Sequence, residues 1–370
     1  LGAVRVRAAQ GDSLSLRYQS PVWLPGPHAQ TIYPALAARW MLGARRSAGA
    51  AGSTSVPPSA YQRMRWDTPD ADFIDIDCIG SPPALISGEG KSVNAGALSG
   101  EERSSAPIVV MFHGLEGSSR SHYARAMAAE LLALGWGGAI VHFRGCSGEP
   151  NRLARAYHSG DTAEIDWVLR RLKSLAGTRA LFAVGVSLGG NALLKWLGEQ
   201  GSSAGSLLRA AVAISAPVDL AAAGDGLARG FNRVYTRMFL NSLKARSLEK
   251  WQRYPTAFDR ARMLQARNLR QFDDVVTAPL HGFDGVDDYY RRASAKPWLR
   301  HIELPTLMIS ARNDPFVPSW SLPQADALSS SITAEFPAEG GHVGFVSGSF
   351  PGHLRWLPMR ALEFFQQQRI

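Results

Sequence analysis

The sequence is short of the features that define several classes of protein. Its 370 residues include only two cysteines, Cys78 and Cys146, which are too few for a disulfide framework and do not form a C-x-x-C pair. The longest apolar runs fall far short of the ~20 residues that a membrane-spanning helix needs. Residues 1–17 contain arginines but no apolar core followed by a cleavage site, so no secretory signal is predicted. We therefore expect a cytoplasmic protein without an integral membrane segment, for which peripheral contact with a membrane stays open.

Motifs for nucleotides, metals and nucleic acids are also missing. The chain has no G-x-x-x-x-G-K-[ST] loop and no H-E-x-x-H motif, so we expect neither a phosphate-binding loop, nor a metal, nor another cofactor. Lys and Arg total 40 against 31 Asp and Glu, but they are scattered, which argues against a nucleic-acid partner. Asp284, Asp287 and Asp288 lie near His281, yet their spacing matches no calcium loop and is typical of a salt-bridged surface. Nothing in the sequence indicates an oligomeric state.

Apolar residues are plentiful, at 45% of the chain, which is enough for a buried core and excludes a disordered protein. Short apolar runs are typical of strands buried on both faces, and they occur at 108–112, 139–143, 181–186 and 210–214. A fifth strand is expected at 306–310 and a sixth at 332–336. Helical patterns occur at 35–42, 121–134, 160–175 (with Thr162 as its expected cap) and 191–199. Strands that alternate with helices predict an α/β fold, in which a mostly parallel central sheet has helices on both faces.

The remaining segments predict the domain organisation. Residues 1–60 are interpreted as an N-terminal extension, and residues 61–370 as one α/β domain. This domain is expected to open with a hairpin formed by 63–66 and 73–78. A long segment of mostly helical pattern, 218–303, interrupts the domain between the fourth and fifth buried strands.

The strongest catalytic signal is the pentapeptide Gly185-Val186-Ser187-Leu188-Gly189, which follows an apolar strand and precedes a helical pattern. In this context G-x-S-x-G is typical of a nucleophile elbow, a tight turn whose small flanking residues let the backbones pass. The N-terminus of the following helix favours negative charge that develops on a substrate. Ser187 is therefore the predicted nucleophile. Cys146 is not favoured for this role, because no base is paired with it in the sequence.

The turn His113-Gly114-Leu115-Glu116-Gly117, directly after the first buried strand, is predicted to complete the site. A flexible turn there can aim a backbone N–H group at the substrate oxygen beside the serine. The expected oxyanion donors are the N–H groups of Leu115 and Leu188. His113 itself is interpreted as a structural brace of the turn rather than as a proton carrier.

A serine nucleophile needs an oriented base, and in proteins with this elbow the acid and then the histidine follow the serine along the chain. His301, His342 and His353 are the histidines that border or follow the fifth buried strand. His342 is the predicted base, because the preceding Gly340-Gly341 pair follows the last strand and lets the ring turn toward the serine. His301 precedes a strand and so belongs to the wrong edge of the sheet, and His353 lies in the terminal segment.

Two aspartates compete for the role of the acid. Asp314 comes just after the run 306–310, where a carboxylate would meet the histidine at the carboxyl edge of the sheet. Asp219 follows the run 210–214, one strand earlier, and has an alternative interpretation as the cap of the next helix. We favour Asp314.

The helical insertion contains the predicted substrate contacts. Phe231, Tyr235, Met238 and Phe239 recur at helical spacing and can share one face, while the neighbouring arginines fall elsewhere. This face either packs on the domain or lines an acyl channel above Ser187. The second interpretation makes Phe231, Tyr235 and Phe239 substrate-binding residues.

Taken together, these segments resemble the YheT-like branch of the α/β-hydrolase superfamily over about nine-tenths of the chain. The resemblance rests on the order of several short segments: 27–31 (PHAQT), 113–117 (HGLEG), 144–148 (RGCSG), 156–160 (AYHSG), 185–190 (GVSLGG), 272–273 (FD), 278–283 (APLHGF), 288–290 (DYY) and 341–345 (GHVGF). It implies an α/β-hydrolase fold with the triad Ser187, Asp314 and His342. It also implies an activity similar to that of carboxylesterases and of acylglycerol or phospholipid hydrolases.

The expected function is that of a serine carboxylic-ester hydrolase. It would act on lipophilic or short- to medium-chain acyl esters through an acyl-serine intermediate, with the insertion as a helical lid and a small ester or lipid as its partner. Acyl transfer to an alcohol on the same triad stays open, although no histidine is followed five residues later by the aspartate of the H-x-x-x-x-D acyltransferase motif. A non-catalytic lipid-binding or scaffold protein is the other alternative, which an intact triad disfavours.

Overall fold

The computed structural model describes residues 17–41, 56, 60–80 and 105–369. One eight-stranded sheet has the order β1-β2-β4-β3-β5-β6-β7-β8. Its strands are β1 (Gln62–Asp67), β2 (Phe73–Ile79), β3 (Ile108–Phe112), β4 (Gly137–His142), β5 (Leu181–Val186), β6 (Ala210–Ile214), β7 (Thr306–Ile309) and β8 (Ile332–Glu335). β2 is antiparallel to both of its neighbours, and all other pairs are parallel. The predicted α/β fold class is therefore confirmed.

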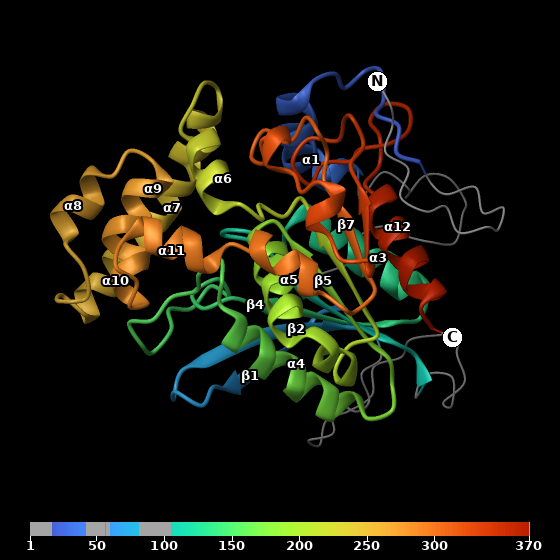
Figure 1. Cartoon of the computed structure of the whole chain (residues 1–370), viewed down its shortest axis with the longest axis horizontal. Coiled ribbons are helices and arrows are strands. Elements are labelled where there is room, and N and C mark those ends of the chain that lie inside the picture. Colours follow the sequence, from blue (N-terminus) through green and yellow to red (C-terminus); the bar gives the residue numbers. More distant parts are fainter. Residues whose placement is uncertain (1–16, 42–55, 57–59, 81–104, 370) are drawn as a thin grey trace.

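Helices cover both faces of the sheet, and each central strand supplies two separate cores. In β3, Ile108, Val110 and Phe112 belong to the core that contains α4 (Thr162–Ala176) and α5 (Leu188–Gln200). Val109 and Met111 of the same strand belong to the core on the other face, with α3 (His122–Ala133) and α12 (Trp356–Gln367). This division follows because successive side chains of a strand point to opposite faces. α4 and α5 lie side by side on their face (Figure 1).

Three helix starts differ from the sequence-based expectations. α5 begins at Leu188 rather than at 191, which makes Ser187 the residue directly before its first turn. Asp161, and not Thr162, stands at the N-cap of α4. α1 spans Pro27–Met41 rather than beginning at 35, because proline is well tolerated in the first turn of a helix, where its missing N–H is not needed.

The predicted hairpin is present as β1 and β2, and it buries two carboxylates within a strand. Asp75 and Asp77 of β2 lie directly opposite Arg65 and Arg63 of β1. Each arginine Nε donates to the facing carboxylate, at 2.8 Å from Arg65 to Asp75 and 2.7 Å from Arg63 to Asp77. Cross-strand ion pairing thus compensates charges that would otherwise be costly to bury in the sheet.

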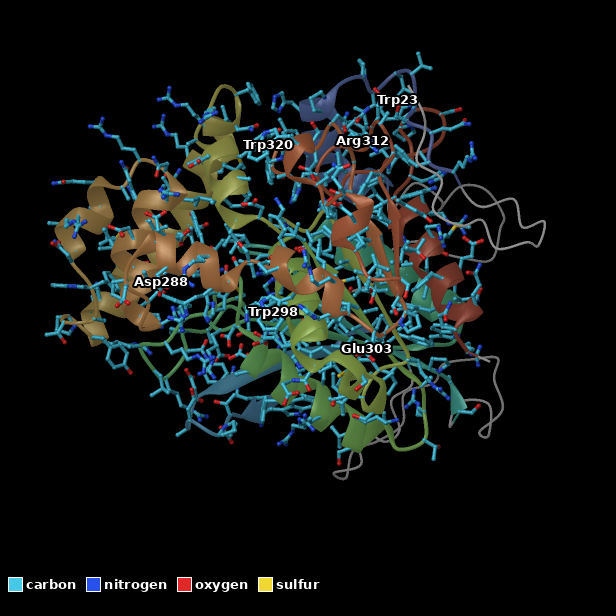
Figure 2. The ribbon with its side chains drawn as sticks, in the orientation of Figure 1. Trp23, Asp288, Trp298, Glu303, Arg312 and Trp320 are labelled. Atoms are coloured by element: carbon cyan, nitrogen blue, oxygen red, sulfur yellow. The ribbon has the colours of Figure 1, made fainter. Side chains whose placement is uncertain are left out.

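The predicted insertion contains several helices between β6 and β7. They are α6 (Leu220–Leu227), α7 (Asn232–Arg253), α8 (Arg260–Gln265), α9 (Leu269–Phe272), a π-helical turn η4 (Asp273–Thr277), α10 (Ala278–Leu280), α11 (Val286–Ala293) and a 3₁₀ turn η5 (Lys296–His301). Other short 3₁₀ turns are η3 (Gly201–Ser206), η6 (Ser319–Ser321) and η7 (Ala325–Ala327). Figure 1 shows α7 to α11 grouped beside the sheet, and Figure 2 places Trp298 of η5 close to α5. There the Lys195 ammonium lies 5.6 Å from the centre of the Trp298 ring.

The insertion helices have an apolar core of their own, which includes Phe258, Met263 and Phe272. None of the helices in the described ranges is long and apolar enough to cross a bilayer.

Candidate active site

Ser187 stands on the turn between β5 and α5 in a backbone conformation that few residues other than glycine adopt, with φ 53° and ψ −117°. Close backbone contacts explain the glycines on either side. A Cβ atom on Gly185 would lie 2.6 Å from the Gly189 carbonyl oxygen, and one on Gly189 would lie 2.4 Å from the carbonyl oxygen of Phe112. The Ser187 N–H donates to the Ile214 carbonyl at 2.8 Å, which anchors the turn on β6. Tight packing of three parallel strands thus holds the serine in its strained turn.

The structure brings Ser187, His342 and Asp314 together, although they are far apart in the sequence. His342 Nε2 lies 3.0 Å from Ser187 Oγ. The Nδ1 atom on the other side of the ring lies 2.8 Å from Asp314 Oδ2. The buried Asp314 carboxylate accepts only, so Nδ1 carries the proton and Nε2 is the acceptor for the serine hydroxyl. The arrangement can remove the hydroxyl proton from Ser187.

Asp314 and His342 are both fixed by further contacts. Asp314 Oδ1 accepts hydrogen bonds from the backbone N–H groups of Phe316, at 2.8 Å, and Val317, at 3.2 Å. The Phe316 ring lies against the imidazole, with ring centres 4.2 Å apart. These contacts leave little freedom for either side chain to turn away.

Asp219, the alternative acid, makes other contacts. Its Oδ1 accepts from the Ala222 N–H at 3.1 Å, which makes it the N-cap of α6. Its Oδ2 pairs with Lys296 at 3.1 Å. Asp219 therefore has the capping role that its position before a helix suggested.

Helix α1 holds the histidine loop, a role that sequence reasoning missed by treating residues 1–60 as an extension. The Gln30 Oε1 atom accepts from Asn313 Nδ2 and from the Gly340 N–H, both at 2.9 Å. Thr31 Oγ1 accepts from the His342 N–H at 2.9 Å. Two neighbouring residues of α1 thus connect the turn of the acid to the loop of the base. The only sequence signal for this role was the place of the PHAQT segment in the family resemblance.

The oxyanion turn is braced on both sides of Leu115. The Gly114 N–H donates to the Tyr123 hydroxyl and the Glu116 N–H to the Tyr157 hydroxyl, each at 3.0 Å. Among backbone hydrogen bonds of the described residues, none uses the N–H of Leu115 or of Leu188. A Cβ on Gly114 would lie 3.1 Å from Ser187 Cβ, so the turn runs directly beside the nucleophile. These two N–H groups are available to a substrate oxygen.

His113 is placed as a brace of this turn. Its Nδ1 lies 2.7 Å from the Gly114 carbonyl oxygen, to which it donates, and its Nε2 accepts from the Phe143 N–H at 3.1 Å. Complete burial lowers the pKa of His113 to about 3, so the ring is neutral and both of its nitrogens are engaged.

A cavity of about 440 Å³ opens above Ser187 and His342. Of the three predicted substrate contacts, Phe239 lies on its wall, whereas Phe231 and Tyr235 do not. Tyr235 is buried behind Phe316, with ring centres 4.8 Å apart, and its hydroxyl lies 3.1 Å from His28 Nδ1. Phe231 is 50% exposed. The three residues that helical spacing placed on one face thus lie in different surroundings: the cavity, the protein interior and solvent. These surroundings depend on the elements that pack against α7.

The remaining candidates make structural contacts. Cys146 is buried, and burial raises the pKa of its thiol to about 11. Its Sγ atom accepts a hydrogen bond from Arg246 Nη1 at 3.1 Å. Asp288 pairs with Arg292 at 3.0 Å, so the acidic cluster is part of a salt-bridged surface (Figure 2). Within the described ranges, no three His, Cys, Asp or Glu side chains are grouped as a metal would require.

A mostly parallel sheet with a serine on the elbow after β5 is the architecture of the α/β hydrolases. Residues 107–349 match the alpha/beta hydrolase fold family. YheT of Escherichia coli (strain K12), an esterase by name, is 39% identical over 299 residues, which cover 80% of this chain and 82% of that protein. The chain therefore belongs to the α/β-hydrolase family, in its YheT-like branch, and is a hydrolase.

More distant proteins agree with this assignment. Phospholipase ABHD3 of Homo sapiens is 27% identical, covering 85% of this chain and 73% of that protein. Monoacylglycerol lipase of Saccharomyces cerevisiae (strain ATCC 204508 / S288c) is also 27% identical, covering 65% and 55%. Among solved structures, the Pyrococcus furiosus esterase Pf2001 superposes with a TM-score of 0.50 at 15% identity, over 83% of this chain and 92% of that one, and so supports the fold alone.

Proposed function

We propose that the protein is a serine carboxylic-ester hydrolase that acts on lipophilic or short- to medium-chain acyl esters through an acyl-serine intermediate. The observation that carries this proposal is the continuous chain of contacts from Ser187 through His342 to Asp314, at 3.0 and 2.8 Å, on the floor of the cavity. Such a chain is the arrangement that activates a serine hydroxyl.

The proposal assigns one group of the chain to each step. His342 Nε2 takes the proton as Ser187 Oγ attacks the ester carbonyl, and the N–H groups of Leu115 and Leu188 stabilise the negative oxygen. The imidazolium then gives the proton to the leaving alcohol, and water repeats the sequence to release the acid. Asp314 holds Nδ1–H and stabilises the imidazolium while it is charged.

The walls of the cavity support an acyl ester as the substrate. Apolar side chains from the insertion form one of its sides, and they include Leu220, Leu227, Phe239, Leu243, Leu269, Phe272, Val276 and Leu280. Pockets lined in this way suit hydrocarbon chains. The names of the relatives, an esterase, a phospholipase and a monoacylglycerol lipase, point to the same class. We assign the insertion 218–303 as the lid of the site on this basis.

The test measures hydrolysis of p-nitrophenyl esters from acetate to palmitate, with monoacylglycerol and lysophospholipid alongside, for the natural protein and for Ser187→Ala. We expect the variant to lose ~10³-fold or more of its activity and all labelling by a serine-directed phosphonate, with an unchanged circular dichroism spectrum. Activity of Ser187→Ala near that of the natural protein would overturn the proposal. Adding an alcohol acceptor and analysing the products separates hydrolysis from acyl transfer.

A further inference from the structure

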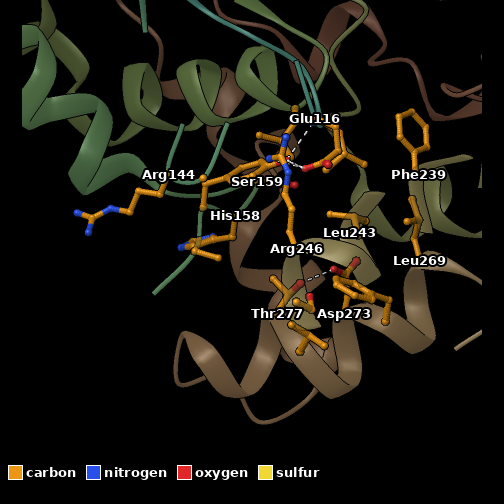
Figure 3. Close-up of a pocket in the computed structure, with 18 of the residues that line it drawn as sticks. Glu116, Arg144, His158, Ser159, Phe239, Leu243, Arg246, Leu269, Asp273 and Thr277 are labelled. Carbon is orange, nitrogen blue, oxygen red and sulfur yellow. Dashed lines mark hydrogen bonds and ion pairs between the residues drawn. The ribbon is translucent and has the colours of Figure 1, made fainter. Parts of the chain in front are cut away.

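The cavity above Ser187 has two sides of different character. The apolar side described above comes from α6, α9, η4, α10 and the first half of α7. The other side comes from the second half of α7 and from residues 144–158, and it is rich in cationic groups. In Figure 3, Phe239, Leu243 and Leu269 lie on one side of the view, Arg144 and His158 on the other, and Arg246 between them.

Three basic residues of α7 line the cavity: Arg246, Lys250 and Arg253. They are separated by four and three positions, which places their side chains on one face of a helix. Lys250 is half-buried and Arg253 is exposed at the rim. The helix therefore presents a row of positive charge along one wall of the proposed substrate site.

Some charges on this wall are compensated within the protein. Arg246 pairs with Glu116 at 3.2 Å (Figure 3). Arg144 pairs with Asp72 at 3.1 Å and also with Glu164. Similarly, a carboxylate of the rim, Glu149, pairs with Arg65 at 2.9 Å.

Lys250 and Arg253 are not compensated in this way. The Lys250 ammonium donates to the carbonyl oxygens of Leu153 and Arg155, both at 3.0 Å, and Arg253 Nη1 donates to the Asn151 carbonyl at 3.3 Å. No ion pair between either residue and a described carboxylate is formed.

The surroundings of Lys250 compensate its charge only in part. Burial lowers the pKa of Lys250 to about 8, because the ammonium loses hydration that the two carbonyl oxygens replace only in part. Asp72 acts on it from a distance but is engaged by Arg144, and Glu249 at the rim is exposed. A half-buried cation whose direct partners are carbonyl dipoles, with its nearest carboxylate shared with another cation, gains from a bound anion that completes its environment.

We propose that Lys250 and Arg253 bind an anionic phosphate or carboxylate group on the alcohol side of the ester, while the acyl chain lies against the apolar side of the cavity. The inference rests on the proposed esterase function and adds a substrate class to it, that of anionic amphiphilic esters. The chemistry is available, because an ammonium has three N–H donors and Lys250 uses two of them on carbonyls. The third donor and the remaining N–H groups of Arg253 can form charge-assisted hydrogen bonds to an anion.

The experiment compares esters that differ only in the charged group. One pair is 1-octanoylglycerol 3-phosphate and 1-octanoylglycerol. The other is O-octanoyl-3-hydroxybutyrate and sec-butyl octanoate, in which a carboxylate replaces a methyl group. We expect kcat/KM to be about tenfold or more higher for the anionic member of at least one pair, the size of one hydrogen bond between charged groups. The pair that shows the preference identifies phosphate, carboxylate or both.

Variants test whether Lys250 is the cause. Lys250→Met should lower the ratio of anionic to neutral kcat/KM about tenfold, mainly through KM, and Lys250→Arg should keep it. Lys244→Met is the matched control, because Lys244 is on the same helix and also donates to two carbonyls, those of Leu264 and Ala266, but does not line this cavity. If Lys250→Met does not fold, Arg253→Gln at the exposed rim gives the same test.

The two proposals fail in different ways. Equal or faster cleavage of both neutral esters by the natural protein would overturn the anion site, as would an unchanged ratio in Lys250→Met and Arg253→Gln. Cleavage of the neutral esters that does not depend on Ser187 would instead overturn the proposed esterase mechanism.

Discussion

Replacing Asp314 by asparagine should remove most of the activity, through a change of a single proton position. Asp314 Oδ1 accepts from the N–H groups of Phe316 and Val317, so the amide oxygen of an asparagine must take that place. The amide NH₂ then replaces Oδ2, which lies 2.8 Å from His342 Nδ1. Because an NH₂ group donates, Nδ1 must become the acceptor and the ring proton must move to Nε2.

The size of the effect follows from this tautomer. With a proton on Nε2, His342 can no longer accept the Ser187 proton across the 3.0 Å contact. In a triad of this kind the corresponding change lowers kcat by ~10⁴-fold, or ~5.5 kcal/mol of barrier. Folding should change little, since the side chain keeps its shape and its backbone hydrogen bonds.

Asp219→Asn is the matched control. Asparagine caps a helix as well as aspartate does, so α6 keeps its cap. The variant loses only the partly exposed pair with Lys296, which is worth less than ~1 kcal/mol. Steady-state kcat on a p-nitrophenyl ester and thermal melting are measured for both variants. A loss below tenfold for Asp314→Asn, or an equal loss for Asp219→Asn, would refute the assignment of the acid.

Three further predictions address an aromatic residue of the cavity wall, the elbow and the half-buried Asp273 carboxyl. Phe239→Ala should shift the acyl-chain preference toward longer esters because Phe239 is on the cavity wall, whereas Phe231→Ala should not; the same shift in both variants would contradict the structure. Gly189→Ala should prevent folding to soluble protein, because its Cβ would lie 2.4 Å from the Phe112 carbonyl oxygen, while Gly205→Ala, with no atom within 4 Å of the new Cβ, should melt within a few degrees of the natural protein. Burial raises the pKa of Asp273 from 3.8 to about 6, so this carboxyl lowers the stability of the folded state progressively as pH rises from about 4 to 6. Asp273→Asn removes that dependence. Its free energy of unfolding, measured by denaturant titration, should exceed that of the natural protein by up to ~3 kcal/mol above pH 6 and should equal it at pH 4. A difference in free energy that is independent of pH would exclude this explanation.

The presence of a mostly parallel sheet and the succession of strands and helices along the chain were predictable from the sequence, for a local reason. β3 and β6 are buried on both faces and are apolar at every position, so the runs 108–112 and 210–214 were visible in the sequence and coincide with these strands. The elbow was visible for a similar reason, because close backbone contacts around Ser187 exclude all but the smallest side chains at Gly185 and Gly189. Chain order then ranked Asp314 and His342 as partners, which the structure places within hydrogen-bond distance.

Only the tertiary structure could decide how separate segments meet. Gln30 is a polar residue in a helix, and its role became visible only when its amide was found between Asn313 and Gly340, about three hundred positions away. The repeat of aromatic residues at 231, 235 and 239 predicted one face, but their neighbours from other segments distribute them among the cavity, the interior and solvent. Likewise, the role proposed for Lys250 depends on the position of its ammonium beside the carbonyl oxygens of Leu153 and Arg155, which the sequence does not show. The helical period in a sequence shows which side chains lie on the same face of a helix. What that face contacts depends on how the helix packs against other elements, which the local sequence does not encode.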